Sequence, residues 1–466
     1  MNANGSIRRM DHGDILLNLF LGTEIEGGPA NLYLRRHGTS IEAVPLLGPQ
    51  SPAAIHLDER GFSAGGEWHG IRFRVSLVLA ESTPAWFWHL RLENTLDTAE
   101  KLDLIYAQDL ALAHYGAVRI NEYYTSHYVD HTPLSHPERG IVLASRQNLS
   151  MAGRQPWCVI GTFGKGVGFA SDALQFHGLA TRAGQVPVGL AEGLDTVRRQ
   201  HENAMAVIQD APVRLGQGEV IERGFFGWFE ADHPEATSAK DLVFVDKAIG
   251  LPEAVPAFDS NAPYGSEPPA SLFTSAPLLD PQDLTEAEIA DLFGTELRAV
   301  ERKDGKILSF FTGTNRHVVL KAKELSVLRP HMQILRTGHR LIPEEAALTS
   351  NTWMGGVFHA MVTQGHVSIN RFLSTPHSYL GLFRGNGLRL FVEMADGWHL
   401  LDVPSAFEMT PESSRWIYKY PAGLIDIRSA APVDGHELTF SAEVLLGGPL
   451  RFFLSWHVAL NGDDGS

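Results

Sequence analysis

The chain has 466 residues, of which 38 are basic and 54 are acidic, and its formal net charge at pH 7 is −16. Nucleic acids and anionic membranes are bound mainly through Lys and Arg, so this charge argues against both as partners. At about 150 residues per domain, the length predicts two or three domains.

Cys158 is the single cysteine, which excludes an intrachain disulfide and fits a reducing compartment. It lies in the apolar run 157–160, which predicts a buried, unreactive thiol. The N-terminal segment lacks the pattern of a signal peptide, and no apolar run reaches the length of a membrane-spanning helix. These observations predict a cytoplasmic protein with no transmembrane helix.

Strand signals dominate the first half of the chain. Residues 71–77 alternate strictly between apolar and polar side chains, and the segments 86–92 and 102–106 also place apolar side chains at every second position. This period is typical of half-buried antiparallel strands. Polar residues at 67–70 and 93–97 predict the turns between them.

The stretch 120–178 mixes tyrosine, histidine, amide and guanidinium side chains more densely than the rest of the chain. A buried strand does not favour this mixture, because each unpaired polar group costs roughly 1–3 kcal/mol. A sugar has apolar faces for aromatic rings and hydroxyls for polar groups, and Trp157 is the candidate stacking platform. The predicted sugar contacts are Tyr123, Tyr128, Asp130, His131, Arg146, Gln147, Asn148 and Trp157.

Other chemistry in this region fits the residues less well. The spacing of His127 and His131 suits a metal only on a helix, which the neighbouring residues disfavour, so no metal site is predicted. Residues 161–168 are glycine-rich, but no Ser or Thr follows Lys165, so we expect a strand, a tight turn and a second strand. The acids that follow the aromatic run 225–229 favour a strand ending in a solvated loop over glycosidase chemistry. No catalytic residue is assigned.

A proline-rich segment, 251–281, separates two regions of strand-like sequence. Thr285–Glu288 is a capping box, with Leu284 and Ile289 as a hydrophobic staple and Gly294 as a stop, which together predict a helix. A second short helix is expected at 322–328. Beyond them, hairpin signals stand at Asp304-Gly305, Asn386-Gly387 and Asp396-Gly397.

The pattern predicts an all-β protein of two antiparallel β-sandwich domains. The first spans 1–250, a proline-rich linker with a short helix spans 251–298, and the second sandwich, cut short at its C-terminal end, spans 299–466.

Several motifs resemble the N-terminal region of the 1,2-β-oligoglucan phosphorylases, which belong with the cellobiose phosphorylases to glycoside hydrolase family 94. The longest is 310–325 (FFTGTNRHVVLKAKEL), and the resemblance covers nearly the whole chain from Asn18. The shorter motifs are 31–35 (NLYLR), 45–49 (PLLGP), 66–71 (GEWHGI), 104–110 (LIYAQDL), 128–131 (YVDH) and 144–148 (ASRQN).

The resemblance implies that the first sandwich is a supersandwich of the galactose-mutarotase type. In such enzymes a helical (α/α)6 barrel holds the catalytic acid for reversible, inverting phosphorolysis of β-1,2-gluco-oligosaccharides to glucose 1-phosphate. This sequence has no barrel-like part and no counterpart of that acid. The resemblance therefore implies a carbohydrate-binding module that acts with a catalytic barrel absent from this sequence, which is either a fragment of a longer enzyme or a stand-alone protein. This chain alone is not assigned an enzyme activity.

Two alternatives stay open: a stand-alone enzyme of mutarotase or epimerase type, and a non-catalytic scaffold for dimerisation. The expected partners are a β-glucan oligosaccharide, a catalytic barrel chain and a second copy of the chain. No cofactor is expected, and inorganic phosphate enters only as a co-substrate of the barrel.

Overall fold

The computed structural model of the protein describes residues 1–58, 61–200, 203–256, 258, 271–338, 344–365, 372–374 and 380–459. Contacts divide the chain into a first unit, Met1–Gly178 with Val186–Thr274, and a second unit, Leu179–Gln185 with Ser275–Ser466. The predicted domain limits at 250 and 298 remain a prediction. Residues 257 and 259–270 of the predicted linker lie outside the described residues.

The first unit consists mainly of strands joined by short helices. Its strands are β1 Asp11–His12, β2 Ile15–Leu16, β3 Asn31–His37, β4 Ile41–Pro45, β5 Ala53–Asp58, β6 Gly61–Trp68, β7 Ile71–Leu79, β8 Ala85–Asn94, β9 Glu100–Asp109, β10 Ala113–His114, β11 Val129–His136, β12 Gly140–Gln147, β13 Trp157–Thr162, β14 Gly166–Asp172, β15 Ala204–Asp210, β16 Val213–Leu215 and β17 Val220–Glu230. Its helices are α1 Tyr115–Ile120, α2 Glu122–His127, α3 Ala173–His177, α4 Val188–Ala191, η2 Ala239–Asp241, α5 Leu242–Ile249 and η3 Pro252–Ala254, and α6 Leu272–Ser275 spans the boundary.

Fourteen of these strands, as far as the structure describes them, form one sheet with the order β4-β3-β9-β15-β14-β12-β13-β17-β8-β7-β6-β5, to which β11 and β16 are added at β12 and β9. Strands that are distant in this order face each other. Trp86 of β8 donates its indole N–H to the Tyr106 hydroxyl of β9 at 3.1 Å, and the Tyr106 ring lies 5.6 Å from that of Phe225 in β17. The sheet therefore folds over its own buried aromatic face, as in a β-sandwich.

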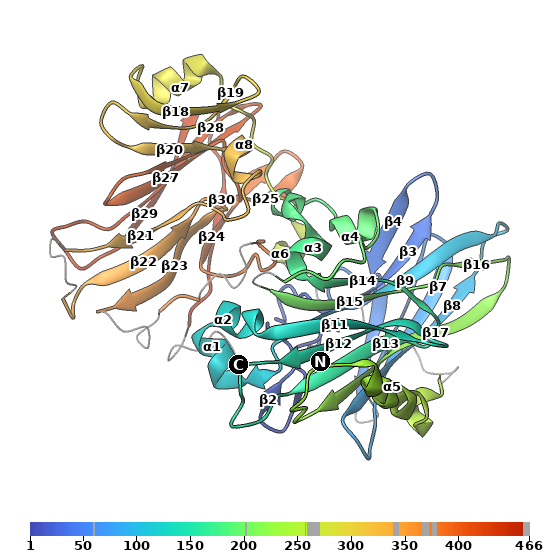
Figure 1. Cartoon of the computed structure of the whole chain (residues 1–466). Coiled ribbons are helices and arrows are strands. Elements are labelled where there is room, and N and C mark those ends of the chain that lie inside the picture. The colour runs from blue at the N-terminus through green and yellow to red at the C-terminus, as the bar shows by residue number, and fades with distance from the viewer. Residues whose placement is uncertain are drawn as a thin grey trace. The chain divides into compact units, whose positions relative to one another are not determined.

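Helix α5 covers another part of the sheet. Figure 1 shows it beside β13 and β17, and it contacts both strands. Val245 and Ala248 are its buried residues, and they pack with Trp157, Phe226 and other apolar side chains of the strands. Because this helix packs on β13, that face of the strand is buried from solvent.

Several predicted strands and turns are confirmed. In β7, Ile71, Phe73 and Val75 are buried while Arg72 is exposed. The turns at His69-Gly70 and Asp304-Gly305 have positive φ at both central residues (49° and 75°, 50° and 79°), as a type I′ hairpin requires.

Two predicted hairpins are wrong. Strands β13 and β14 form as expected on either side of the glycine-rich turn, but they do not pair with each other: β13 pairs with β12 and β17, and β14 pairs with β15 and bridges β12. Asn386-Gly387 precedes β24, Leu388–Met394, but β24 pairs with strands that follow it in sequence. For β13 and β14, long-range pairing outweighs the local turn signal, whereas β24 forms its local hairpin with β25 at Asp396-Gly397.

The second unit also consists mainly of antiparallel strands. They are β18 Leu297–Lys303, β19 Lys306–Thr312, β20 His317–Leu320, β21 Met332–Arg336, β22 Leu348–Trp353, β23 Val357–Gln364, β24, β25 Gly397–Leu400, β26 Ala406–Met409, β27 Ser413–Tyr420, β28 Gly423–Ala430, β29 Thr439–Leu446 and β30 Phe452–Trp456. Its helices are η1 Leu179–Ala183, α7 Glu286–Phe293 and α8 Lys321–Glu324, the last being shorter than predicted.

Three sheets of the second unit share one core. The sheet β18-β19-β20-β26-β27-β28-β29 contributes Phe407 and Trp416, β23 contributes Phe358, and β24 contributes Leu390. Helix α7 begins at the predicted capping box: Thr285 Oγ1 accepts from the Glu288 N–H at 3.3 Å, and the Glu288 carboxylate accepts from the Thr285 N–H at 2.7 Å. Because sheets make up most of both units, the predicted all-β class is confirmed.

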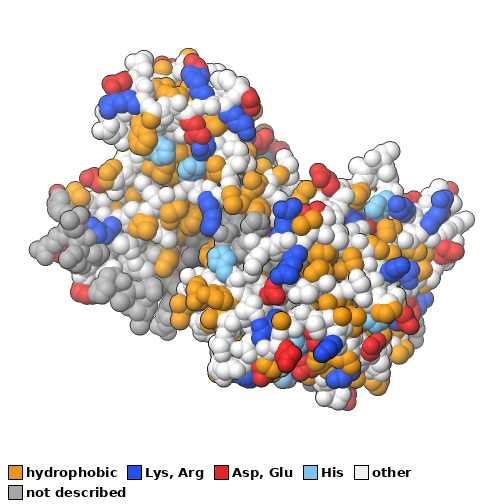
Figure 2. Space-filling view, in the orientation of Figure 1, with side chains coloured by type: hydrophobic (Ala, Val, Ile, Leu, Met, Phe, Trp, Pro, Cys, Tyr) orange, Lys and Arg blue, Asp and Glu red, His pale blue; other side chains and the backbone are white. Residues whose placement is uncertain are grey.

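Side chains of both charge signs are interspersed over the face shown in Figure 2, with apolar side chains between them. Among the described residues, every helix is too short or too polar to span a bilayer.

Candidate functional site

Strands β11 and β12 bring several of the predicted sugar contacts together. They pair so that Asp130 lies opposite Arg146 and His131 opposite Ser145. Asp130 pairs with the Arg198 guanidinium at 2.6 Å. Arg146 donates to the carbonyl oxygens of His233 and Pro234, each at 2.8 Å, and to the Asn148 side chain. These three side chains form a polar edge whose charges are already partnered within the protein.

Tyr128 follows helix α2 and is 37% exposed. Its hydroxyl donates to that of Tyr124 at 3.2 Å, and the two rings lie 5.0 Å apart. Tyr124 is 49% exposed, so the pair presents aromatic surface to solvent, whereas the predicted contact Tyr123 is half-buried. Neither helix α2 nor the contribution of Tyr124 was predicted from the sequence, although one helical turn separates the two tyrosines.

Three predicted contacts are buried and cannot face a ligand from this edge. Trp157 is fully buried: its ring stacks on that of His233 at 5.1 Å, and its indole N–H donates to Thr237 at 3.0 Å. The Gln147 amide donates to the carbonyls of Ala111 and Thr125. The prediction of Trp157 as a stacking platform is therefore wrong, because α5 and its flanking loop cover the strand.

His131 is also buried, with Nδ1 2.9 Å from Ser145 Oγ. Burial lowers the pKa of His131 to about 3, so its ring is neutral near pH 7. Cys158 is buried as predicted, and burial raises its thiol pKa to about 12, which keeps it unreactive.

The glycine-rich turn is filled by a carboxylate. Asp210 accepts from the Lys165 N–H and from the Thr162 hydroxyl, each at 3.0 Å. A carboxylate in this position leaves no cradle for a phosphate and agrees with the rejection of a P-loop. Within the described ranges, no three His, Cys, Asp or Glu side chains are grouped to hold a metal.

A groove of about 670 Å³ opens in the first unit beside strands β7 and β8. Trp86, Trp88 and Phe229 form its buried lining, and the exposed side chains of Leu57 and Leu79 extend its apolar wall. Its volume lies in the range of about 300–1,000 Å³ that is usual for small-molecule sites. Polar side chains at the groove are Arg9, Asp11, His12, Glu81, Ser82 and Thr83.

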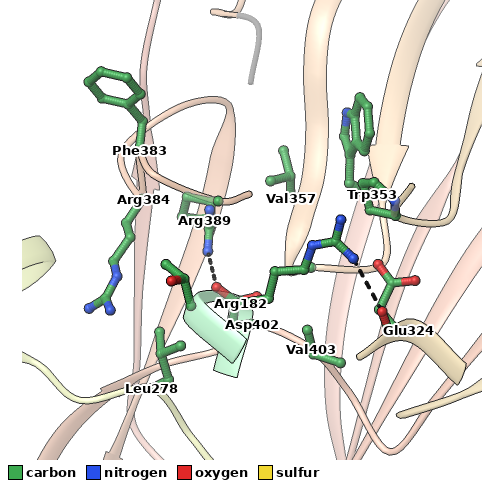
Figure 3. Close-up of a pocket in the computed structure, with 14 residues that line it drawn as sticks. Arg182, Leu278, Glu324, Trp353, Val357, Phe383, Arg384, Arg389, Asp402 and Val403 are labelled. Atoms are coloured by element: carbon green, nitrogen blue, oxygen red, sulfur yellow. Dashed lines mark hydrogen bonds and ion pairs between the residues drawn. The ribbon is translucent and has the colours of Figure 1, made fainter. Parts of the chain in front are cut away.

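A smaller pocket, of about 60 Å³, lies in the second unit (Figure 3). Arg389 of β24 points toward Asp402 and approaches its carboxylate at 3.3 Å, and Trp353 of β22 stands on the opposite wall. Arg182 of η1 donates to the carbonyl oxygens of Val327 at 2.7 Å and Glu324 at 3.3 Å. Guanidinium groups and an indole ring therefore line the same pocket.

The residues that line the two cavities were not predicted as site residues from the sequence. Those of the smaller pocket are scattered from Thr181 to Val403, so no local motif connects them. One signal was present: Arg389 interrupts the apolar run of β24, where a charged residue is rare without a partner.

Comparison with known proteins finds two family models that match parts of the chain. Residues 1–227 match the family model of the SOGP N-terminal domain, and residues 296–465 match the glycoside phosphorylase supersandwich domain. The chain is 28% identical over 468 residues to a 1,2-beta-oligoglucan phosphorylase of Listeria innocua serovar 6a, a match that covers 99% of this chain and 41% of that protein. The chain thus spans about two fifths of that relative's length.

Two solved structures share a weaker likeness. A polysaccharide lyase aligns over 91% of this chain and 40% of its own, with a TM-score of 0.30 and 7% identity. A protein described as a kojibiose phosphorylase from the human microbiome aligns over 53% of this chain and 33% of its own, with a TM-score of 0.28 and 11% identity.

Proposed function

Because this chain carries the SOGP N-terminal domain and the glycoside phosphorylase supersandwich domain, we propose that it is the carbohydrate-binding part of a phosphorylase. The observation that carries the proposal is the match over 99% of the chain to 41% of a 1,2-beta-oligoglucan phosphorylase. The ligand is a β-1,2-linked gluco-oligosaccharide. The complete enzyme carries out reversible, inverting phosphorolysis that releases glucose 1-phosphate. That enzyme is a member of glycoside hydrolase family 94.

The groove beside β7 and β8 supports an oligosaccharide as the ligand. A sugar ring offers C–H faces that pack on apolar walls such as those of Leu57 and Leu79, and hydroxyls that pair with polar groups at a rim. Rim side chains such as Asp11, Glu81 and Ser82 supply acceptors and donors for those hydroxyls. The edge formed by Tyr128, Asp130, Arg146 and Asn148 remains a second proposed contact.

Catalysis is assigned to a separate helical barrel. Phosphorolysis needs a carboxylic acid that protonates the leaving oxygen while phosphate attacks the anomeric carbon. The proposed partners of this chain are therefore the glucan, a barrel that supplies the acid, and a second copy of the chain. No cofactor is proposed, and the proposed location is the cytoplasm.

Calorimetry with sophorose and longer β-1,2-gluco-oligosaccharides tests the proposal. We expect saturable binding that Leu79→Arg weakens by about tenfold or more, because the new side chain occupies the groove and its charge must be desolvated. Val220→Arg is the matched control, since Val220 is an exposed strand residue outside the groove lining.

The same titration separates the two candidate surfaces. Tyr128→Ala should leave the affinity unchanged if the groove alone binds sugar, and it should weaken binding if the edge contributes. Absence of heat at millimolar ligand would contradict the proposal, and so would equal affinity in Leu79→Arg and the unmodified chain. Release of glucose 1-phosphate by this chain alone would overturn the assignment of catalysis to a barrel.

A further inference from the structure

The pocket of the second unit has chemistry that the proposed sugar site does not use. Its lining includes residues of η1, of α8, of strands β22, β23 and β24, of the segment 381–384 before β24, and of the segment around Asp402. All of these belong to the same unit. Its features are therefore independent of the groove in the first unit.

Two buried N–H donors at this pocket lack a hydrogen-bond partner among the residues that the structure describes. They are Nε of Arg389 and Nε1 of Trp353, and both residues line the pocket. Arg389 is 3% exposed, so water bathing the surface does not satisfy its guanidinium. An unsatisfied buried donor costs about 1–3 kcal/mol, and more when it is charged, so both donors indicate a missing acceptor.

The pocket is cationic although the whole chain carries a net charge of −16. Three arginines, Arg182, Arg384 and Arg389, stand against two acids, Glu324 and Asp402. Both acids already have partners within the protein, and that of Asp402 is Arg389 at 3.3 Å. Glu324 lies 2.6 Å from the His331 ring and accepts from the His331 N–H at 3.0 Å. Burial raises the pKa of Asp402, against the opposing effect of Arg389 and Arg384.

The individual guanidinium groups have different roles. Arg182 donates to the backbone carbonyls of Val327 at 2.7 Å and Leu328 at 2.5 Å, so it contributes positive charge while it is fixed in place. Arg389 makes only the 3.3 Å contact to Asp402 among its described ion pairs, and its Nε remains available. In Figure 3 the Arg389 guanidinium is directed at Asp402, and Trp353 lies across the view from it, above Glu324.

A ligand that accepts hydrogen bonds and carries negative charge would satisfy the two unpartnered N–H donors and would balance the positive charge of the pocket. The volume of about 60 Å³ is well below the roughly 300–1,000 Å³ that is usual for small-molecule sites, which suits a small tetrahedral oxyanion better than a sugar ring. Arginine binds phosphate through the planar array of its N–H groups, and such charge-assisted bonds are stronger than neutral ones.

We propose that this pocket binds a phosphate group, supplied either by inorganic phosphate or by a sugar phosphate monoester. Arg389 holds the oxyanion, Trp353 donates its indole N–H to the bound ligand, and Arg182 and Arg384 supply positive charge. The residues of this site belong to the second unit, whereas those of the proposed glucan groove belong to the first.

Phosphorus NMR and calorimetry on the full chain, with inorganic phosphate and with glucose 1-phosphate as separate probes, test this site. We expect saturable one-to-one binding, weakened about tenfold or more by Arg389→Lys, which removes Nε but keeps the charge. Trp353→Phe removes one donor and keeps an aromatic ring, so it should weaken binding several-fold. Tighter binding of the monoester would identify a sugar phosphate as the ligand, and equal binding would identify the inorganic ion.

Arg451→Gln is the control, because Arg451 is exposed on the same unit and outside the pocket. It should leave phosphate affinity unchanged. Sophorose affinity should also be unchanged in Trp353→Phe, which separates this site from the glucan site. No saturable phosphate binding at millimolar concentration would overturn the proposal, and so would equal losses in Arg451→Gln and Arg389→Lys. Folding of each variant is checked by its unfolding temperature, and Trp353→Phe provides the test if Arg389→Lys does not fold.

Discussion

Two histidines of the first unit are kept neutral by burial. The pKa is lowered by burial to about 3 for His131 and to about 4 for His177. An unfolded histidine titrates near 6.5, so the unfolded chain takes up protons that the folded chain excludes. The stability associated with these residues is fully present above pH 6.5 and is lost as the pH falls below it.

His131→Gln tests this consequence at a single residue. As the pH falls from about 6 to 4, the free energy of unfolding of the first unit should decrease in both proteins. We expect the slope of this decrease to be smaller in the variant, and the difference between the two slopes to be about 1.4 kcal/mol per pH unit. Urea unfolding at a series of pH values measures the difference. His127→Gln, at an exposed position in the same region, serves as the control. Parallel curves for the His131 variant and the unmodified chain would contradict the lowered pKa.

At the scale of the element, local signals predicted those structures that local interactions determine. Helix α7 begins at the predicted capping box, and the hairpin at Asp304-Gly305 forms at its predicted turn. The pairing of β13 with β17 was not predictable, because its partner lies about 70 residues away and no turn connects the two. The burial of Trp157 has the same origin: α5, which covers it, follows the strand at a similar distance in sequence.

Thr285→Ala tests the contribution of the capping box. Removing the hydroxyl leaves the Glu288 N–H without its side-chain acceptor, so we expect the second unit to lose about 1 kcal/mol of stability. Chemical unfolding followed by tryptophan fluorescence measures the change. Asp291→Ala, at an exposed position of the same helix, should leave stability unchanged or raise it slightly. A Thr285 variant as stable as the Asp291 variant would show that the cap contributes nothing.

At the scale of the whole molecule, the all-β class followed from the sequence, but the course of the chain between its units did not. Residues 179–185 leave the first unit, join the second and return. No composition shift marks this excursion, unlike the prolines at 251–281. The pocket in the second unit was therefore not predictable either, because Arg182 reaches it from within the sequence of the first unit.

Arg182→Met tests this division. The variant leaves the carbonyl oxygens of Glu324, Val327 and Leu328 without their donor, at a cost of about 1–3 kcal/mol each if they stay dry. Hydrogen exchange should show lost protection in the second unit, at α8 and β24, with the first unit unchanged. The control Arg198→Met, at an exposed ion pair of the first unit, should affect neither unit measurably. Lost protection confined to the first unit would contradict the division.

The excursion at η1 also limits how these regions can be exchanged between proteins. Arg182 lies within residues 1–227, which match one family, while its side chain completes a pocket in the unit that contains residues 296–465, which match another. A recombination event with a single joint between the two matches would transfer a supersandwich that lacks this arginine. We therefore expect the two regions to be inherited together, and a transplanted second region to need a substitute cation at the same place.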